Sequence, residues 1–77
     1  MIKILLFAEL QEEAGVDQIE VDKAGSTVTE LKEWLLQEYK LSSLSNTMIA
    51  INESYATEEE RVKDGDTVAF IPPVSGG

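Results

Sequence analysis

One stretch, residues 27–40, carries the pattern of an amphipathic helix, and the segments on either side of it carry strand patterns. Thr27 is a favoured N-cap residue, and Glu30 follows it at the spacing of a capping box. Apolar residues then recur at the helical period, with Trp34 beside them: Val28, Leu31, Leu35 and Tyr39. In a chain of 77 residues, which is one domain, this arrangement predicts an α+β fold with one main helix packed on one face of a mixed sheet.

The two ends of the chain carry strand patterns whose alternation assigns their faces. Residues 1–7 alternate, and the side that carries Lys3 prefers water. The sequence therefore places the alternate set in the core: Ile2, Ile4 and Leu6. The alternation in residues 67–71 divides the last strand in the same way, with its core side formed by Val68 and Phe70. Phe7 and Ile71 are left on the uncovered face, where exposed apolar side chains predict a docking patch.

The remaining segments predict shorter elements. We expect a helical turn or loop over 8–15 closed by Gly15, strands over 17–21 and 48–51, a short strand at 55–56, and a turn that buries Leu41 and Leu44. The first and last strands can lie parallel in the centre of the sheet, because the helix and loops leave room for a crossover. Pro72 and Pro73 cannot continue a sheet ladder. The chain therefore divides into a folded domain, 1–71, and a flexible tail, 72–77.

The composition excludes much side-chain chemistry. The chain has no cysteine and no histidine, so it lacks the residues that most often serve as nucleophile, general base and metal ligand. Its 15 carboxylates show no spacing typical of a metal or glycosidase site, and we expect no bound metal. Lys32 falls on the polar side of the helix, and residues 58–60 form a run of surface charge.

The charge and the hydropathy pattern bear on partners and location. A formal net charge of −9 repels nucleic acid and anionic membranes and attracts a basic protein partner. No apolar run approaches the roughly 20 residues that span a bilayer. The apolar residues 2–8 lack the basic flank of a signal peptide. We expect a cytoplasmic protein.

The chain ends in Gly76 and Gly77, which offer a carboxylate on a thin strand that can enter a channel too narrow for any Cβ. Extended, residues 72–77 reach about 20 Å at roughly 3.3 Å per residue. Because the side chains supply so little chemistry, the terminal carboxylate is the leading candidate for a reacting group. Gly77 would carry the reaction, and Gly76 would supply the flexibility of the tail.

Several segments together resemble a known family: residues 2–8 with Gly15, residues 50–52, and above all the run from Asp64-Gly65-Asp66 to Pro-Pro-Val-Ser-Gly-Gly. The layout resembles the ubiquitin-like β-grasp fold, and the motifs resemble the small, sulfur-carrying subunits of molybdopterin synthases over essentially the whole chain. Two departures stand out. Gln11-Glu12 occupies a segment where family members often have Arg-Glu, and Phe70-Ile71 replaces two aromatic residues.

This resemblance implies a mechanism. An adenylating enzyme related to ubiquitin-activating enzymes joins AMP to Gly77, sulfur from a persulfide donor replaces the AMP, and the resulting thiocarboxylate donates sulfur to cyclic pyranopterin monophosphate. The chain itself binds no cofactor and is not an enzyme alone, because catalysis belongs to the large subunit, with which it forms a heterotetramer of two small and two large subunits. The positions that match the family's docking surface are Phe7, Tyr55 and Ile71, followed by the tail residues Pro72, Pro73, Val74 and Ser75.

Three alternatives share the fold or the tail. A sulfur carrier of thiamine synthesis differs in its partner and acceptor, and the Pro-Pro-Val-Ser approach to Gly-Gly favours the molybdopterin interpretation. A protein modifier would form an isopeptide bond with lysines of its targets. A plain ubiquitin-like interaction domain would function without Gly76 and Gly77.

Overall fold

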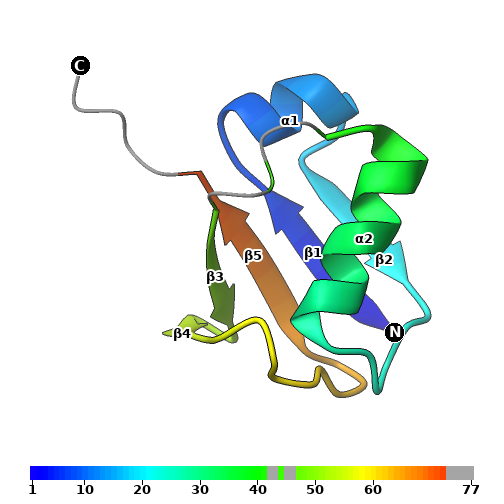
Figure 1. Cartoon of the computed structure of the whole chain (residues 1–77), viewed down its shortest axis with the longest axis vertical. Helices are drawn as coiled ribbons and strands as arrows, with labels where there is room; N and C mark the ends of the chain where they lie inside the picture. The colour runs from blue at the N-terminus through cyan, green and yellow to red at the C-terminus, as the bar shows by residue number, and fades with distance from the viewer. Residues whose placement is uncertain (42–43, 45–46, 73–77) are drawn as a thin grey trace.

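The computed structural model describes residues 1–41, 44 and 47–72 and shows two helices and five strands within them (Figure 1). The elements in chain order are β1 (Ile2–Leu6), α1 (Glu9–Ala14), β2 (Gln18–Val21), α2 (Val28–Tyr39), β3 (Met48–Ile51), β4 (Ser54–Tyr55) and β5 (Thr67–Ile71). These bounds confirm the predicted order. The fourth strand, expected at 55–56, begins one residue earlier and ends at Tyr55.

The strands form one mixed sheet in the order β2-β1-β5-β3-β4. β1 and β5 lie parallel in its centre, as predicted, with Lys3 opposite Thr67 and Leu6 opposite Phe70. All other pairs are antiparallel. The first and last strands of the chain are therefore neighbours, and everything between them is folded around this central pair.

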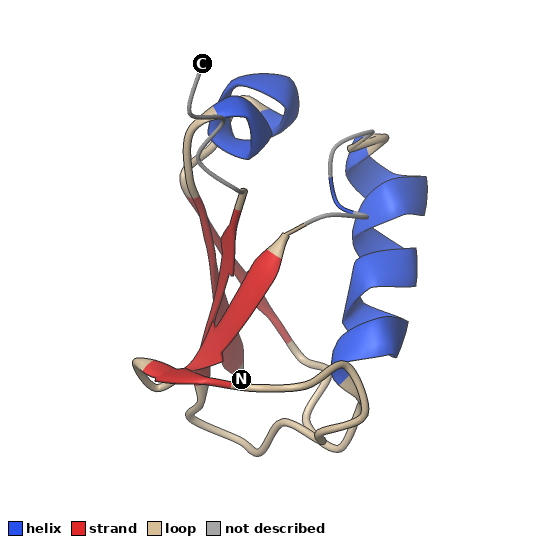
Figure 2. Ribbon diagram, turned by 60° about the vertical axis from the view of Figure 1, so that its left-hand side comes forward, coloured by secondary structure: helices blue, strands red, loops and turns tan. Residues whose placement is uncertain are grey.

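The core lies between the sheet and α2, which form two layers (Figure 2). The predicted inward sides of both end strands are confirmed, because each of these side chains is buried: Ile2, Ile4, Leu6, Val68 and Phe70. From α2 come Val28, Leu31 and Leu35, and the segment after it adds Leu41 and Leu44, also as predicted. α2 covers this face alone, and no helix within residues 1–41, 44 and 47–72 covers the opposite face of the sheet (Figure 2).

The start of α2 is held from two sides. Its capping box is confirmed, since Thr27 Oγ1 accepts a hydrogen bond from the N–H of Glu30 at 3.2 Å and the Glu30 carboxylate accepts one from the N–H of Thr27 at 2.8 Å. The carbonyls of Glu60 and Glu58 accept hydrogen bonds from Val28 and Thr29 at 3.0 and 3.1 Å. The N–H groups that a helix leaves unpaired at this end are thus satisfied.

Lys32 is a correction to the sequence analysis, which assigned it to the polar side of the helix. Lys32 is only 8% exposed, and its ammonium group forms an ion pair with the carboxylate of Glu58. A long lysine stem can lie along apolar surface while its charged end finds a partner. The charge run at 58–60 is exposed, as expected, but Glu58 also anchors α2.

Three non-glycine residues that flank strands have positive φ. Ala8 follows Phe7 with φ 52° and ψ −125°, at a tight turn closed by a 3.1 Å hydrogen bond from Leu10 N–H to the Phe7 carbonyl. Asn52 and Glu53 connect β3 to β4 with φ of 51° and 70°. Left-handed backbone costs a non-glycine residue about 1–2 kcal/mol, and two-residue hairpins still require it at both central positions.

Candidate functional site

The candidate site is the uncovered face of the sheet. The strand register stacks apolar side chains there in rows, with Leu5 beside Ala69, Ala69 beside Ala50, and Ala50 beside Tyr55. At the end of the sheet where β5 finishes, Met48 lies opposite Ile71. Because paired residues in a ladder point to the same face, these rows form one continuous apolar surface.

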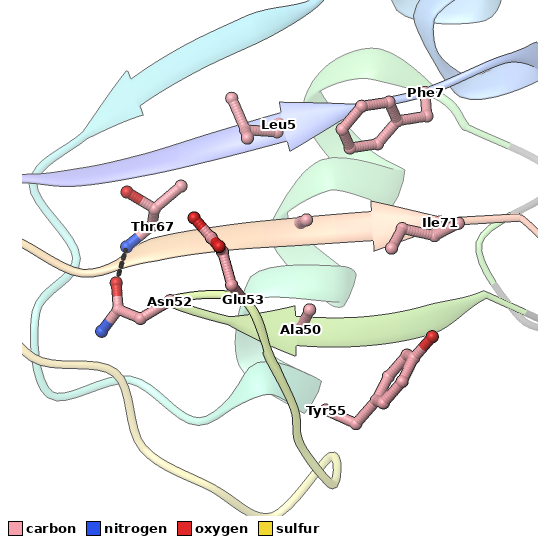
Figure 3. A pocket seen from close by; sticks show the side chains of 9 residues that line it. Leu5, Phe7, Ala50, Asn52, Glu53, Tyr55, Thr67 and Ile71 are labelled. Carbon is pink, nitrogen blue, oxygen red and sulfur yellow. Dashed lines mark hydrogen bonds between the residues drawn. The ribbon is translucent and has the colours of Figure 1, made fainter.

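A groove of about 520 Å³ runs over this surface. The small residues Ala50 and Ala69 leave room at its centre, and the larger side chains Phe7, Ile71 and Tyr55 stand around it (Figure 3). Phe7 is 43% exposed and Tyr55 77% exposed, while Ile71 is half-buried. The structure thus brings together in one groove Phe7 and Ile71, which the alternation placed on this face, and Tyr55, which the family resemblance added.

The opposite end of the groove is polar and firmly built. Asn52 donates from its side-chain amide to Asp66 at 2.9 Å and accepts from the N–H of Thr67 at 3.0 Å. Asp66 also accepts from the N–H of Lys63 at 2.8 Å. These hydrogen bonds, first that of Lys63 and then that of Asn52, hold the pKa of Asp66 below its ordinary value. The network fixes the β3–β4 turn against the start of β5.

β5 carries the chain toward its C-terminal segment beside the apolar end of the groove. Pro72 comes directly after Ile71 and is buried, although the sequence analysis assigned it to the tail. Pro73, Val74, Ser75, Gly76 and Gly77, the other tail residues singled out, lie outside the described residues. The chain therefore leaves the sheet at Ile71, which lies opposite Met48 and lines the same groove as Phe7.

Met48 is a surface residue that sequence reasoning missed. It is 42% exposed and lies opposite Ile71. The signal was hidden because Met48-Ile49-Ala50-Ile51 is apolar throughout, so alternation could not divide its faces. Only the pairing with β5, whose faces are known, assigns Met48 to the groove side.

Within 1–41, 44 and 47–72, no cluster of three acidic residues is placed to hold a metal ion. Across the same residues, no helix combines the length and apolar character that crossing a bilayer requires.

The fold is that of a ubiquitin-like β-grasp protein, with an open groove on the uncovered face of its sheet. The sequence model of the ThiS family matches residues 4–77. The "Molybdopterin synthase sulfur carrier subunit" of Haemophilus influenzae is 36% identical, with all of both chains covered. The chain belongs to the ThiS family, among the molybdopterin synthase sulfur carrier subunits.

Solved structures give the same fold. A putative molybdopterin converting factor subunit 1 of Pyrococcus furiosus has a TM-score of 0.83 at 30% identity, with 95% of this chain and 97% of that chain covered. The small archaeal modifier protein 1 of Methanosarcina acetivorans has a TM-score of 0.82 at 26% identity, with 99% and 95% covered. Subunit 1 of the Helicobacter pylori factor, at 23% identity and a TM-score of 0.71, shares the fold and is solved in complex with subunit 2.

Proposed function

We propose that this chain is the sulfur-donating subunit of a molybdopterin synthase, acting in the cytoplasm through the carboxylate of Gly77. The observation that carries the proposal is the position of β5. This central strand ends at Ile71 beside an apolar groove and leads into the Pro-Pro-Val-Ser-Gly-Gly run. A partner that docks on the groove is therefore positioned to receive the segment that follows.

The chemistry starts from a poor electrophile. The Gly77 carboxylate attacks the α-phosphorus of ATP, pyrophosphate leaves, and an acyl-adenylate forms. Hydrosulfide then attacks the acyl carbon, and the bond to AMP breaks. A persulfide attacks in the same way but gives an acyl disulfide, and a second thiol of the donor must cleave its S–S bond to form a donor disulfide and release the thiocarboxylate. With hydrosulfide the products are the thiocarboxylate, AMP and a proton. The chain supplies only the acyl group, which agrees with its lack of cysteine and histidine.

In the second half of the cycle the thiocarboxylate sulfur passes to cyclic pyranopterin monophosphate in the large subunit's active site. Each carrier delivers one sulfur, and the dithiolene of molybdopterin needs two. We propose that Phe7, Tyr55 and Ile71 contact the large subunit during this step, and that two small and two large subunits form the assembly. The same groove would serve the adenylating enzyme in turn, since both partners must reach Gly77.

The deciding experiment is the intact mass of the protein after incubation with the adenylating enzyme of its own organism, ATP and sulfide. We expect one oxygen to be replaced by sulfur, localised to Gly77, and an AMP adduct when sulfide is withheld. A variant that lacks Gly77 should gain neither, and its circular dichroism should be unchanged because every core side chain lies within residues 2–70. An unchanged mass for the native chain would contradict the proposal.

A second candidate is protein modification, favoured by the likeness to the small archaeal modifier protein 1. In that case the same acyl-adenylate chemistry would end in an isopeptide bond to a lysine of a target. Blots of a lysate for covalent ladders that depend on Gly77 distinguish the two functions. Ladders without thiocarboxylate-dependent molybdopterin synthesis would favour the modifier, and synthesis without ladders would favour the carrier.

A further inference from the structure

The two residues of the β3–β4 turn share a left-handed backbone but differ in what their side chains do. Asn52 offsets its conformation with two side-chain hydrogen bonds, to Asp66 and from Thr67. Asparagine also tolerates positive φ better than most residues. Glu53, with φ of 70°, has neither advantage, because none of the hydrogen bonds and ion pairs among the described residues includes its carboxylate.

Glycine is the residue that such a turn position favours. A glutamate there makes the isolated domain less stable than a glycine would, and the fold draws no internal contact from it. Backbone strain of this kind is most often found where a residue serves a function. The stability of the domain therefore does not explain why position 53 carries a carboxylate.

Glu53 lies at the groove on the uncovered face of the sheet. Glu53 is exposed and lines it together with Thr67 and Ala69 (Figure 3). Its side chain extends from the turn across β5, and so places a negative charge at the polar end of the groove, beside the apolar surface. The one cation that shares this face on the neighbouring β1 is Lys3, whose Cα partners are Thr67 and Glu20, and no ion pair among the described residues joins it to Glu53.

We propose that Glu53 is a specificity-determining contact of the docking face, and that it pairs with a lysine or arginine of the protein that covers the groove. The inference rests on the proposed function, since the protein meant is the large subunit of the synthase. Such a partner would have an apolar patch that covers Phe7, Ile71 and Tyr55. It would also carry a basic side chain that reaches Glu53 at the other end of the groove. The net charge of −9 steers such a basic partner toward this chain.

The location of the charge makes the pair effective. An ion pair between fully exposed side chains contributes little, because water screens it. At the edge of an apolar groove, docking removes water from around the carboxylate, and a charged partner then becomes necessary to offset the lost solvation. A partner without that cation would leave Glu53 desolvated and unpaired, so the residue selects against wrong proteins as well as for the right one.

The test measures, for single substitutions at Glu53, both the stability of the free chain and its binding to the large subunit, which are expected to change in opposite directions. Glu53→Gly should raise the denaturation midpoint of the free chain, because it relieves the positive φ, and should weaken binding to the large subunit of the same organism. Glu53→Gln keeps the strain and removes the charge. It should leave the midpoint nearly unchanged and raise the Kd about five- to tenfold at low salt, with a smaller salt dependence than the native chain shows.

The matched control is Glu59→Gln, which removes one negative charge from an exposed site outside the groove lining. It should bind like the native chain, which separates a local contact from a general charge effect. If the native chain and Glu53→Gln bind the large subunit equally well, the assignment of Glu53 is overturned while the proposed function stands. If the native chain does not bind the large subunit at all, the proposed function fails, and the pairing of Glu53 fails with it.

Discussion

Lys32, in the middle of α2, forms an ion pair with Glu58, a residue 26 positions further along the chain. The ammonium end is almost fully covered, while Glu58 remains about half exposed at 54%. The segment that carries Glu58 also supplies the carbonyls that accept from Val28 and Thr29. One loop thus fixes the helix both at its first turn and at its second.

We expect Glu58→Ala to destabilise the domain by about 1–2 kcal/mol, because it leaves a buried ammonium without its partner. The figure is below that of a fully buried pair because water still reaches position 58. Urea denaturation followed by circular dichroism measures the loss. The backbone hydrogen bonds of the loop do not depend on the side chain and should persist.

Lys32→Met provides the counterpart, since it replaces a covered charge with an apolar side chain of similar length. We expect it to be neutral or slightly stabilising, and the double variant with Glu58→Ala to show no further loss. Additive losses in the double variant would show that the two side chains do not act as a pair.

Phe7→Ala should weaken binding to the large subunit by about 2 kcal/mol, roughly thirtyfold, and lower the stability of the free chain by less than about 1 kcal/mol. The reason is that Phe7 is 43% exposed in the free chain, and the proposed docking would cover it. Leu36→Ala is the control, because Leu36 is exposed to the same degree, 45%, but lies on α2. A Phe7 variant that binds normally and melts much earlier would assign the ring to the core instead.

Ala8→Gly should stabilise the domain by about 1 kcal/mol, because φ 52° with ψ −125° is natural only for glycine. Thermal or urea denaturation of the free chain tests this. Ala14→Gly, at the last residue of α1, is the matched control and should have the opposite sign, since glycine costs a helix up to about 0.5–1 kcal/mol. Two variants that both destabilise would contradict the strain assigned to Ala8.

Because the pKa of Asp66 is lowered in the folded chain, we expect its contribution to the stability of the domain to depend on pH. The hydrogen bonds from Lys63 and Asn52 favour the ionised carboxylate, so its contribution to stability is complete above the pKa of an unfolded aspartate, about 3.9. It disappears as the pH falls through the lower pKa of the folded state. The stability difference between the native chain and Asp66→Asn should therefore shrink on acidification, and a difference that is constant with pH would argue against this role.

The main helix and the end strands could be predicted because local chemistry decides them. At the start of a helix, a threonine and a glutamate three residues later can each accept a hydrogen bond from the other's backbone N–H, as Thr27 and Glu30 do. In the first strand, Lys3 marks one face as exposed, so the other face must point to the core. Gly15 also behaves as its residue type suggests and closes α1 in the left-handed conformation.

The sequence could not predict features that depend on distant contacts. Lys32 is buried because Glu58 reaches it, and no pattern within the helix signals that approach. Ala8 adopts a conformation that its own chemistry opposes, because the turn between Phe7 and Leu10 demands it. Met48 is assigned to the groove side of the sheet only through its pairing with Ile71. In each case tertiary structure overrides a local preference.

The parallel pairing of β1 with β5 has a consequence for synthesis on the ribosome. The strand made first has its central partner among the residues made last, so Ile2, Ile4 and Leu6 have no finished core until residue 70 has emerged. Contacts this distant in sequence form slowly. A nascent chain that stalls before Thr67 leaves those side chains exposed to chaperones and proteases. The central parallel pair can therefore form only after nearly the whole folded domain has left the ribosome.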